Sequence, residues 1–247
     1  MGVLLLKVCE YCGEEFETDR SNKRFCCKSC AGQSRFKEDI GLFRDDVDDY
    51  IQKYLLGLII TDGCVYAAKN HMYICISLKD KYMIQKIRDI VCPTKKVYKD
   101  GNNSQVKWRN DRDIEYLCSL GIGVRKTYTV ELPVFNDNMW HLMRGIFDGD
   151  GCVYKSRIID KKYNHKYIYT YIRFTTGSSV FAEQLNKFLL ENDIQSHMHV
   201  DRRKDKRKNT TYYITIQKRD SVFRFRDLIY KNCNDWFLKR KYQVFLE

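Results

Sequence analysis

The sequence predicts an α+β fold of two pseudo-symmetric repeats, each in the order αββαββ(α) with antiparallel strands, preceded by a small cysteine-rich module. Three observations predict it. The pentapeptide Asp-Gly-Cys-Val-Tyr occurs twice, at 62–66 and at 150–154. Each copy closes an apolar stretch and is followed by a similar alternation of strand-like and helix-like segments. Five cysteines lie within the first thirty residues.

A helix is expected immediately before each copy of the pentapeptide. Acidic residues at Asp45–Asp49 and polar residues at Asn136–Asn138 are typical of helix starts. Gly63 and Gly151 stand where a helix normally ends, and the Val-Tyr that follows each glycine is typical of the start of a strand.

The two helices are expected to pack against each other. Gly57 and Gly145 lie six residues before the helix ends, where a missing side chain lets two backbones approach closely. Parallel packing would bring Asp62 and Asp150 together at two negative helix ends, and a divalent metal is the simplest way to relieve their repulsion. The alternative is that both aspartates are solvated caps of two core helices.

The remaining segments follow one order in both repeats. In the first repeat we expect strands at 64–68 and 72–78, a helix at 80–91, a hairpin of strands at 95–99 and 105–109, and a helix at 111–120. In the second we expect strands at 152–158 and 167–175, a helix at 178–192, strands at 197–203 and 212–218, and a helix at 221–230. The predicted domains are therefore the cysteine module (1–38), the first repeat (45–132) and the second repeat (136–247).

Strand alternation in the second repeat predicts a one-sided sheet. Ile168, Ile172 and Phe174 fall on one face of their strand, while tyrosines and Arg173 fall on the other. Tyrosine and arginine on such a face can contact bases and phosphates, although a solvated aromatic face is the alternative. The candidate nucleic-acid contacts are Tyr167, Tyr169, Tyr171, Arg173, Arg202, Arg203, Tyr213, Gln217, Lys107 and Arg109.

The chain is strongly basic, with a net charge of +12 and a pI of about 9.1. Phosphate backbones are the natural partner of such a field, although solvated surfaces are often basic too. No apolar run approaches membrane-spanning length and no secretion signal is evident. We therefore expect a soluble protein of the cytoplasm or of an organelle, with no membrane partner.

The amino-terminal cysteines predict a structural zinc site. Cys9 and Cys12 form a Cys-x-x-Cys pair followed by glycine, and further cysteines follow at Cys26, Cys27 and Cys30. Cys27 with Cys30 would make a second such pair. The string instead resembles FCS-type zinc fingers, and that resemblance implies Cys9, Cys12, Cys26 and Cys30 as the ligands, with Cys27 as the alternative to Cys26.

The duplicated apolar helix, Asp-Gly and strand resemble the LAGLIDADG homing endonuclease family of the single-chain, two-motif type. The nine matching positions are Leu55–Gly63 and Met143–Gly151. The resemblance implies a monomer that makes a double-strand break in a long, asymmetric double-stranded DNA target. It also implies that Asp62 and Asp150 hold divalent metals, most simply Mg²⁺.

A basic residue is expected near each scissile phosphate. Lys126 and Lys241 follow the last helix of their repeats and resemble the family's active-site lysine. Lys126 as a simple phosphate contact, and Lys239 or Arg240 in place of Lys241, are the alternatives; Lys79 and Gln217 are weaker candidates. Asp148, which aligns with Ile60 of the first copy, is expected to support the metal ligands or to cap a helix.

Other functions of the same sequence are a group I intron maturase, whose partner would be its own intron RNA, and a DNA-binding regulator that does not cleave. Retention of both Asp62 and Asp150 argues against the regulator. A zinc-stabilised adaptor protein would show neither metal-dependent cleavage nor strongly salt-dependent affinity for DNA.

Overall fold

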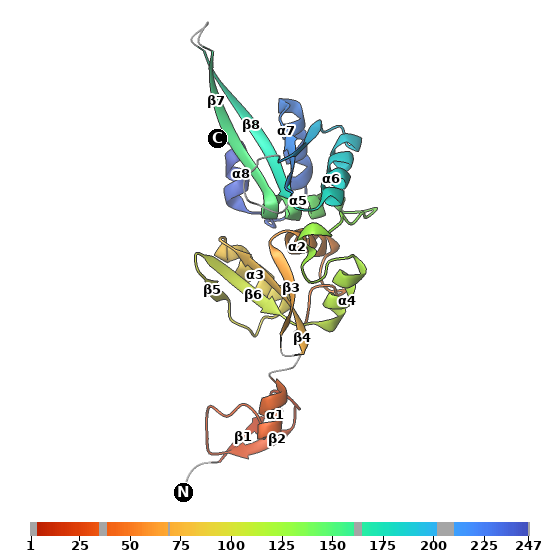
Figure 1. Cartoon of the computed structure of the whole chain (residues 1–247). Helices are drawn as coiled ribbons and strands as arrows, with labels where there is room; N and C mark the ends of the chain where they lie inside the picture. Colours follow the sequence, from red (N-terminus) through yellow and green to blue (C-terminus); the bar gives the residue numbers. More distant parts are fainter. Residues whose placement is uncertain (1–3, 35–38, 69, 161–164, 202–209, 247) are drawn as a thin grey trace. The chain divides into compact units, whose positions relative to one another are not determined.

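The computed structural model describes residues 4–34, 39–68, 70–160, 165–201 and 210–246 (Figure 1). The chain divides into two compact units, Met1–Asp39 (the first unit) and Ile40–Glu247 (the second unit).

The first unit contains a short hairpin and a short helix. Strand β1 (Leu5–Val8) pairs antiparallel with β2 (Glu15–Thr18), and helix α1 (Lys28–Gln33) follows. The Cys27 side chain accepts a hydrogen bond from the backbone N–H of Cys30 (3.3 Å) and so caps the start of α1. These elements were not predicted from the sequence, because strands of 4 residues and a helix of 6 are too short to show a clear apolar period.

The second unit runs through the same order of elements twice. The first repeat comprises α2 (Asp49–Ile60), β3 (Gly63–Ala68), β4 (His71–Leu78), α3 (Lys81–Val91), β5 (Tyr98–Asp100), β6 (Asn103–Trp108) and α4 (Asp111–Ser119). The second comprises α5 (Met139–Asp150), β7 (Gly151–Asp160), β8 (His165–Thr176), α6 (Ser179–Glu191), β9 (Ser196–Val200), β10 (Tyr212–Ile216) and α7 (Arg219–Tyr230). The 3₁₀ turn η2 (Lys126–Tyr128) follows α4, and helix α8 (Lys239–Leu246) follows α7. The predicted α+β fold in the order αββαββ(α) is confirmed.

Each repeat folds its strands into one antiparallel sheet with the same connectivity. The strand orders are β3-β4-β6-β5 and β7-β8-β10-β9. Figure 1 shows α2 and α5 between the two sheets, and the β7–β8 hairpin projecting beyond the rest of its sheet. The second sheet therefore offers a longer surface than the first.

Several element boundaries differ from the prediction. The strand expected at 95–99 begins only at Tyr98, because the backbone N–H of Lys95 is held in a turn by the Cys92 carbonyl (2.9 Å). The strand expected at 197–203 ends at Val200, and Arg202 and Arg203 lie outside the described residues. Helix α8 was not predicted, because a segment of 8 residues is too short for its apolar pattern to distinguish a helix from a strand.

One hydrophobic core runs through both repeats, and α2 and α5 cross at its centre. Tyr54–Ile60 of α2 are all buried. The helices touch where Gly57 meets Gly145: a Cβ added to Gly57 would overlap the Leu142 carbonyl oxygen and lie 2.8 Å from Cα of Gly145. A Cβ added to Gly145 would overlap the Tyr54 carbonyl oxygen in turn. Only glycine at both positions permits this backbone-to-backbone contact.

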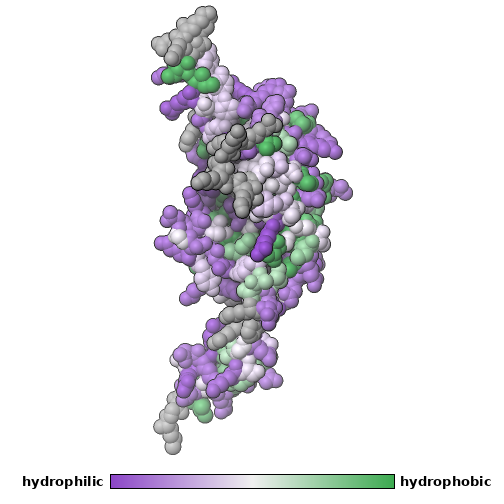
Figure 2. Space-filling view, viewed as in Figure 1, coloured by the Kyte–Doolittle hydropathy of each residue, from purple (hydrophilic) through white to green (hydrophobic). Residues whose placement is uncertain are grey.

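Hydrophilic side chains cover much of the face of the second unit seen in Figure 2. Exposed apolar side chains include Ile158 and Ile159 on β7 and Ile168 on β8. Within the described part of the chain, no helix combines the length and the apolar composition that crossing a membrane requires.

We predict that Gly57→Ala and Gly145→Ala each destabilise the second unit, by about 1–3 kcal/mol or more, because the new methyl group meets backbone atoms that have no free space to move into. The free energy of unfolding from denaturant titration measures this. Gly123→Ala is the matched control, since a Cβ there meets nothing within 4 Å. Two glycine variants as stable as the control would contradict the close helix contact.

Candidate active site

Two aspartates stand at the ends of helices α2 and α5. Asp62 follows α2 after the capping residue Thr61, and Asp150 is the last residue of α5. Both aspartate side chains reach solvent, whereas the next residues, Gly63 and Gly151, are buried at the start of their strands. The two carboxylates therefore stand at the surface on rigid supports.

The charge of one carboxylate acts on the other. Partial burial raises the pKa of Asp150 to about 6, and the negative charge of Asp62 adds to this rise. Partial burial also raises the pKa of Asp62, while Lys241, Arg240 and Lys126 act in the opposite direction. The charge of Asp62 can act on Asp150 in this way only where the two side chains lie in the same region.

A buried lysine accompanies each aspartate. Lys126 Nζ donates a hydrogen bond to the carbonyl oxygen of Gly63 (2.6 Å), and Lys241 Nζ donates one to the carbonyl oxygen of Gly151. Only 8% of Lys126 and 7% of Lys241 is exposed. Because each of these glycines directly follows one of the aspartates, the two lysines occupy equivalent positions in the two repeats.

The two ammonium groups sit in a setting that disfavours their charge. Burial lowers the pKa of Lys241 to about 8 and also lowers that of Lys126, although the nearby aspartates act against both changes. Lys241 Nζ also donates to the carbonyl oxygens of Phe147 (2.6 Å) and Gly149 (3.1 Å). These carbonyls belong to the last turn of α5, where the helix presents its negative pole.

The alternative basic candidates make other contacts. Arg240 is paired with Asp80 at 2.8 Å, and the Lys239 ammonium lies over the Tyr82 ring, 5.7 Å from its centre. Lys79 is exposed after β4.

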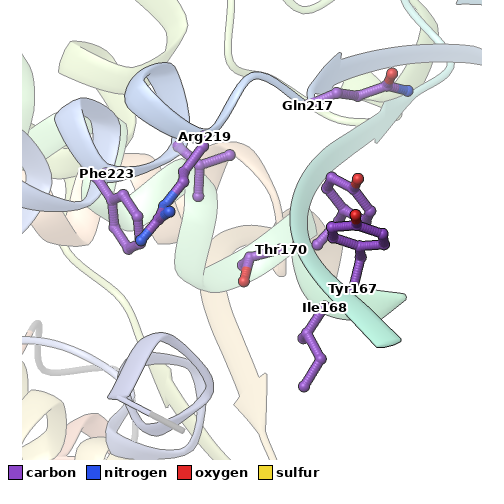
Figure 3. Close-up of a pocket in the computed structure, with 8 residues that line it drawn as sticks. Tyr167, Ile168, Thr170, Gln217, Arg219 and Phe223 are labelled. Carbon is purple, nitrogen blue, oxygen red and sulfur yellow. The ribbon is translucent and has the colours of Figure 1, made fainter. Parts of the chain in front are cut away.

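Gln217 lines a separate pocket of about 330 Å³ with tyrosines of β8 and with Arg219 and Phe223 of α7 (Figure 3). A second cavity, described next, is lined by Asp150. The two cavities have no lining residue in common.

A cavity of about 290 Å³ opens beside Asp150 and Lys126. Its walls carry hydroxyl groups from the residue that follows α2, from η2, from the end of β8 and from the two residues before β10. These belong to Thr61, Thr127, Tyr128, Thr175, Thr176, Thr210 and Thr211. This group was not predicted from the sequence, because its members come from segments far apart in the chain.

Asp148 is fully buried behind the pair of exposed aspartates. Its Oδ2 accepts hydrogen bonds from the Tyr54 hydroxyl (2.9 Å) and from the backbone N–H of Leu238 (2.8 Å). Burial raises its pKa to about 6. Leu238 directly precedes α8, so Asp148 fixes the start of the helix that carries Lys241.

The second sheet carries a row of aromatic and basic side chains on the face opposite its buried Ile172 and Phe174. Tyr167, Tyr169 and Tyr171 follow one another along β8 with ring centres 6.2 and 6.3 Å apart. The guanidinium of Arg173 lies 5.5 Å from the ring centre of Tyr213. In the first sheet, Lys107 lies on β6 and Arg109 just after it, where Arg109 pairs with Asp111 at 3.4 Å.

The first unit brings four thiols together. The sulfur atoms of Cys9, Cys12, Cys26 and Cys30 all lie within 4.8 Å of one another. Cys27 is outside this group, because its sulfur caps α1 instead. Four thiols at such distances could hold one tetrahedral metal ion.

The second unit thus has a two-fold repeated α+β fold with paired aspartates at the ends of its two central helices. This is the fold of the LAGLIDADG homing endonucleases, and the predicted resemblance to that family is confirmed: residues 139–230 match the model of the LAGLIDADG-like domain. No curated protein sequence matches the chain.

Solved structures of several homing endonucleases are similar in fold. I-GzeII in complex with its DNA target has a TM-score of 0.53 and 13% identity, covering 78% of this chain and 87% of its own. I-DmoI in complex with DNA and Ca gives 0.52 and 18%, with 80% and 98% covered. I-SmaMI bound to uncleaved DNA target in the presence of calcium ions gives 0.51 and 11%, with 78% and 87% covered.

We predict that Asp148→Ala lowers the free energy of unfolding by about 1–3 kcal/mol, because it leaves the Leu238 N–H and the Tyr54 hydroxyl buried without an acceptor. Asp148→Asn keeps a carbonyl oxygen in the same place and should cost less. Denaturant titration of the two variants beside the unmodified chain measures the difference. Equal stability of all three proteins would show that these hydrogen bonds do not hold α8.

Proposed function

We propose that the chain is a site-specific DNA endonuclease that makes a divalent-metal-dependent double-strand break. The observation that carries the proposal is the pair of exposed carboxylates, Asp62 and Asp150. The backbone carbonyl of the glycine after each aspartate accepts a hydrogen bond from a buried lysine. This arrangement provides two equivalent reacting centres in one chain, as cleavage of two strands requires.

Asp62 and Asp150 are the residues we propose to hold the metal, with Mg²⁺ as the natural ion. Two exposed carboxylates with raised pKa values fit this role, because oxygen donors suit a hard cation and its positive charge would relieve their repulsion. When bound, the metal activates a water molecule and stabilises the leaving oxygen.

Lys126 and Lys241 supply the positive charge that the protein itself brings to the site. The Lys126 ammonium is held by the Gly63 carbonyl at the start of β3, and the Lys241 ammonium by carbonyls at the end of α5, so both are fixed before the substrate arrives. Fixed charges of this kind stabilise the negative charge that develops on a phosphate without reorganising during the reaction.

The sheet surfaces supply the DNA contacts in this proposal. The tyrosines of β8 with Arg173 and Tyr213 in the second repeat, and Lys107 with Arg109 in the first, would contact bases and phosphates of double-stranded DNA. The net charge of +12 supports a phosphate-rich partner, and the similar solved proteins were crystallised with DNA targets. The longer β7–β8 hairpin makes the two halves unequal, which suits a monomer acting on an asymmetric site.

We further propose that the first unit holds a structural Zn²⁺ through Cys9, Cys12, Cys26 and Cys30. The convergence of these four sulfurs supports it. The described residues of this unit form two short strands and one short helix, so metal binding would supply much of its folding energy.

We predict that Asp62→Asn and Asp150→Asn each reduce double-strand cleavage by at least about 100-fold, the scale on which losing one stabilising group at a reacting centre acts. The assay incubates the protein with a DNA library of candidate intronless sites, with Mg²⁺ or with a chelator, and sequences the cut ends. Asp89→Asn, which neutralises an exposed aspartate paired with Arg88, is the matched control.

Cleavage that survives either site variant, or that proceeds in chelator, would sink the endonuclease proposal. Mg²⁺-independent binding of DNA without cleavage would point to a regulator of the same fold. Stimulated splicing of an intron RNA, tested separately, would add the maturase role.

We predict about one Zn²⁺ per purified chain, lost in Cys26→Ser and retained in Cys27→Ser, because the Cys27 sulfur lies at the helix cap and outside the group of four. Elemental analysis of the two purified variants measures the metal content. Loss of zinc in Cys27→Ser with retention in Cys26→Ser would overturn this choice of ligands.

A further inference from the structure

Two cysteines face each other across the first sheet. Cys64 of β3 and Cys75 of β4 are direct partners in the antiparallel register, so their side chains lie on the same face. The next pair on that face, Tyr66 and Tyr73, stacks with ring centres 5.6 Å apart. On the other side of Cys75 lies its partner on β6, Lys107.

The two thiols differ in accessibility but lie in contact range. Cys64 is exposed, whereas Cys75 is 4% exposed, and both are free. Burial raises the pKa of the Cys75 thiol to about 12, and the adjacent Cys64 thiol contributes to the rise. Directly opposed residues on antiparallel strands have Cβ atoms about 4.5–5.5 Å apart, and a disulfide needs about 3.5–4.5 Å. A small movement of the two strands would therefore be enough to join them.

The position of this pair connects it to the candidate active site. Cys64 follows Gly63, whose carbonyl oxygen accepts the Lys126 hydrogen bond, and Asp62 directly precedes that glycine. In the second repeat the equivalent Cys152 faces Arg173 instead of a cysteine. Among the described strands, the first sheet alone therefore pairs two cysteines across this row.

We propose that Cys64 and Cys75 form a reversible disulfide that slows DNA cleavage. The proposal rests on the endonuclease function above. The oxidant is a low-molecular-weight disulfide such as oxidised glutathione. The Cys64 sulfur attacks it, forming a mixed disulfide and releasing one thiol; the Cys75 sulfur then attacks Cys64, forming the protein disulfide and releasing the second thiol. Two protein thiols are oxidised, one small disulfide is reduced to two thiols, and the two protons pass to those thiols.

The disulfide would act through geometry. Drawing Cys64 towards Cys75 moves the start of β3, and this backbone carries both the Asp62 carboxylate and the Gly63 carbonyl that holds Lys126. Displacement of reacting groups by about 1 Å is enough to cost up to 100-fold in rate. Disulfides in reducing compartments are typically transient and regulatory, which fits an exposed thiol above a buried partner.

The test treats the full zinc-loaded chain with oxidised glutathione and then maps disulfides by mass spectrometry of proteolytic peptides. We expect a peptide containing Cys64 linked to Cys75, and cleavage of target DNA at least about tenfold slower than before treatment, restored by dithiothreitol. The ratio of oxidised to reduced activity is measured for each protein separately. Cys64→Ser and Cys75→Ser should bring this ratio close to one, whereas Cys118→Ser, which removes an exposed thiol on α4, should leave it as in the unmodified chain.

Absence of the linked peptide would overturn the proposal, whatever the activity. A linked peptide with unchanged cleavage would overturn its regulatory part. Inhibition that persists in Cys64→Ser would assign the effect to other cysteines and would also overturn it. Because the peptide is read by mass, the pairing can be judged even if the chain cleaves no DNA.

Discussion

The contact between Gly57 and Gly145 determines where the rest of the second unit can be. Two helix backbones touch at this point, and the absence of both side chains is what lets them do so. From there each helix runs only a few residues to its end, so the two ends stay close together. The carboxylates of Asp62 and Asp150 are neighbours because of this crossing, and the two sheets start from the same place on opposite sides.

Bringing two helix ends together concentrates negative charge. Two buried lysines partly neutralise this charge. The last carbonyls of both helices and two carboxylates share a small region, which no hydrophobic contact can stabilise. Hydrogen bonds offset the cost of burying these charges: Lys241 donates to three carbonyl oxygens and Lys126 to the Gly63 carbonyl, and the nearby aspartates favour both charges. The same lysines limit the rise in the pKa of the aspartates, so the two charges of each sign define one electrostatic unit.

The sequence was sufficient for features that repeat and insufficient for those that depend on distant contacts. Duplication of the pentapeptide predicted the two aspartates and the order of elements, and the family resemblance suggested Lys126 and Lys241 while leaving Lys239 and Arg240 open. Helix α8 escaped prediction because it is held by tertiary contacts: the Tyr82 hydroxyl of the first repeat donates to the Phe237 carbonyl (2.9 Å) and accepts from the Lys239 N–H (2.9 Å). The choice between Cys26 and Cys27 likewise depends on which sulfur the helix cap takes.

The two repeats differ at Asp148, and the difference is related to the elements that carry the two buried lysines. Its counterpart in the first repeat is Ile60, which is also buried, so the two positions have the same exposure but opposite polarity. Lys126 lies in the 3₁₀ turn η2. This turn is stabilised by a backbone hydrogen bond from the Val130 N–H to the Lys126 carbonyl (2.8 Å). Lys241 instead lies on α8, where the N–H groups of Lys239 and Lys241 bond to the Tyr82 hydroxyl (2.9 Å) and to the Leu238 carbonyl (2.9 Å). The Asp148 carboxylate accepts the N–H of Leu238, directly before α8, and so places negative charge at the positive end of that helix. In the second repeat an aspartate therefore supports the helix that carries Lys241, whereas the first repeat, whose Lys126 lies in a 3₁₀ turn, has an apolar side chain at the same position.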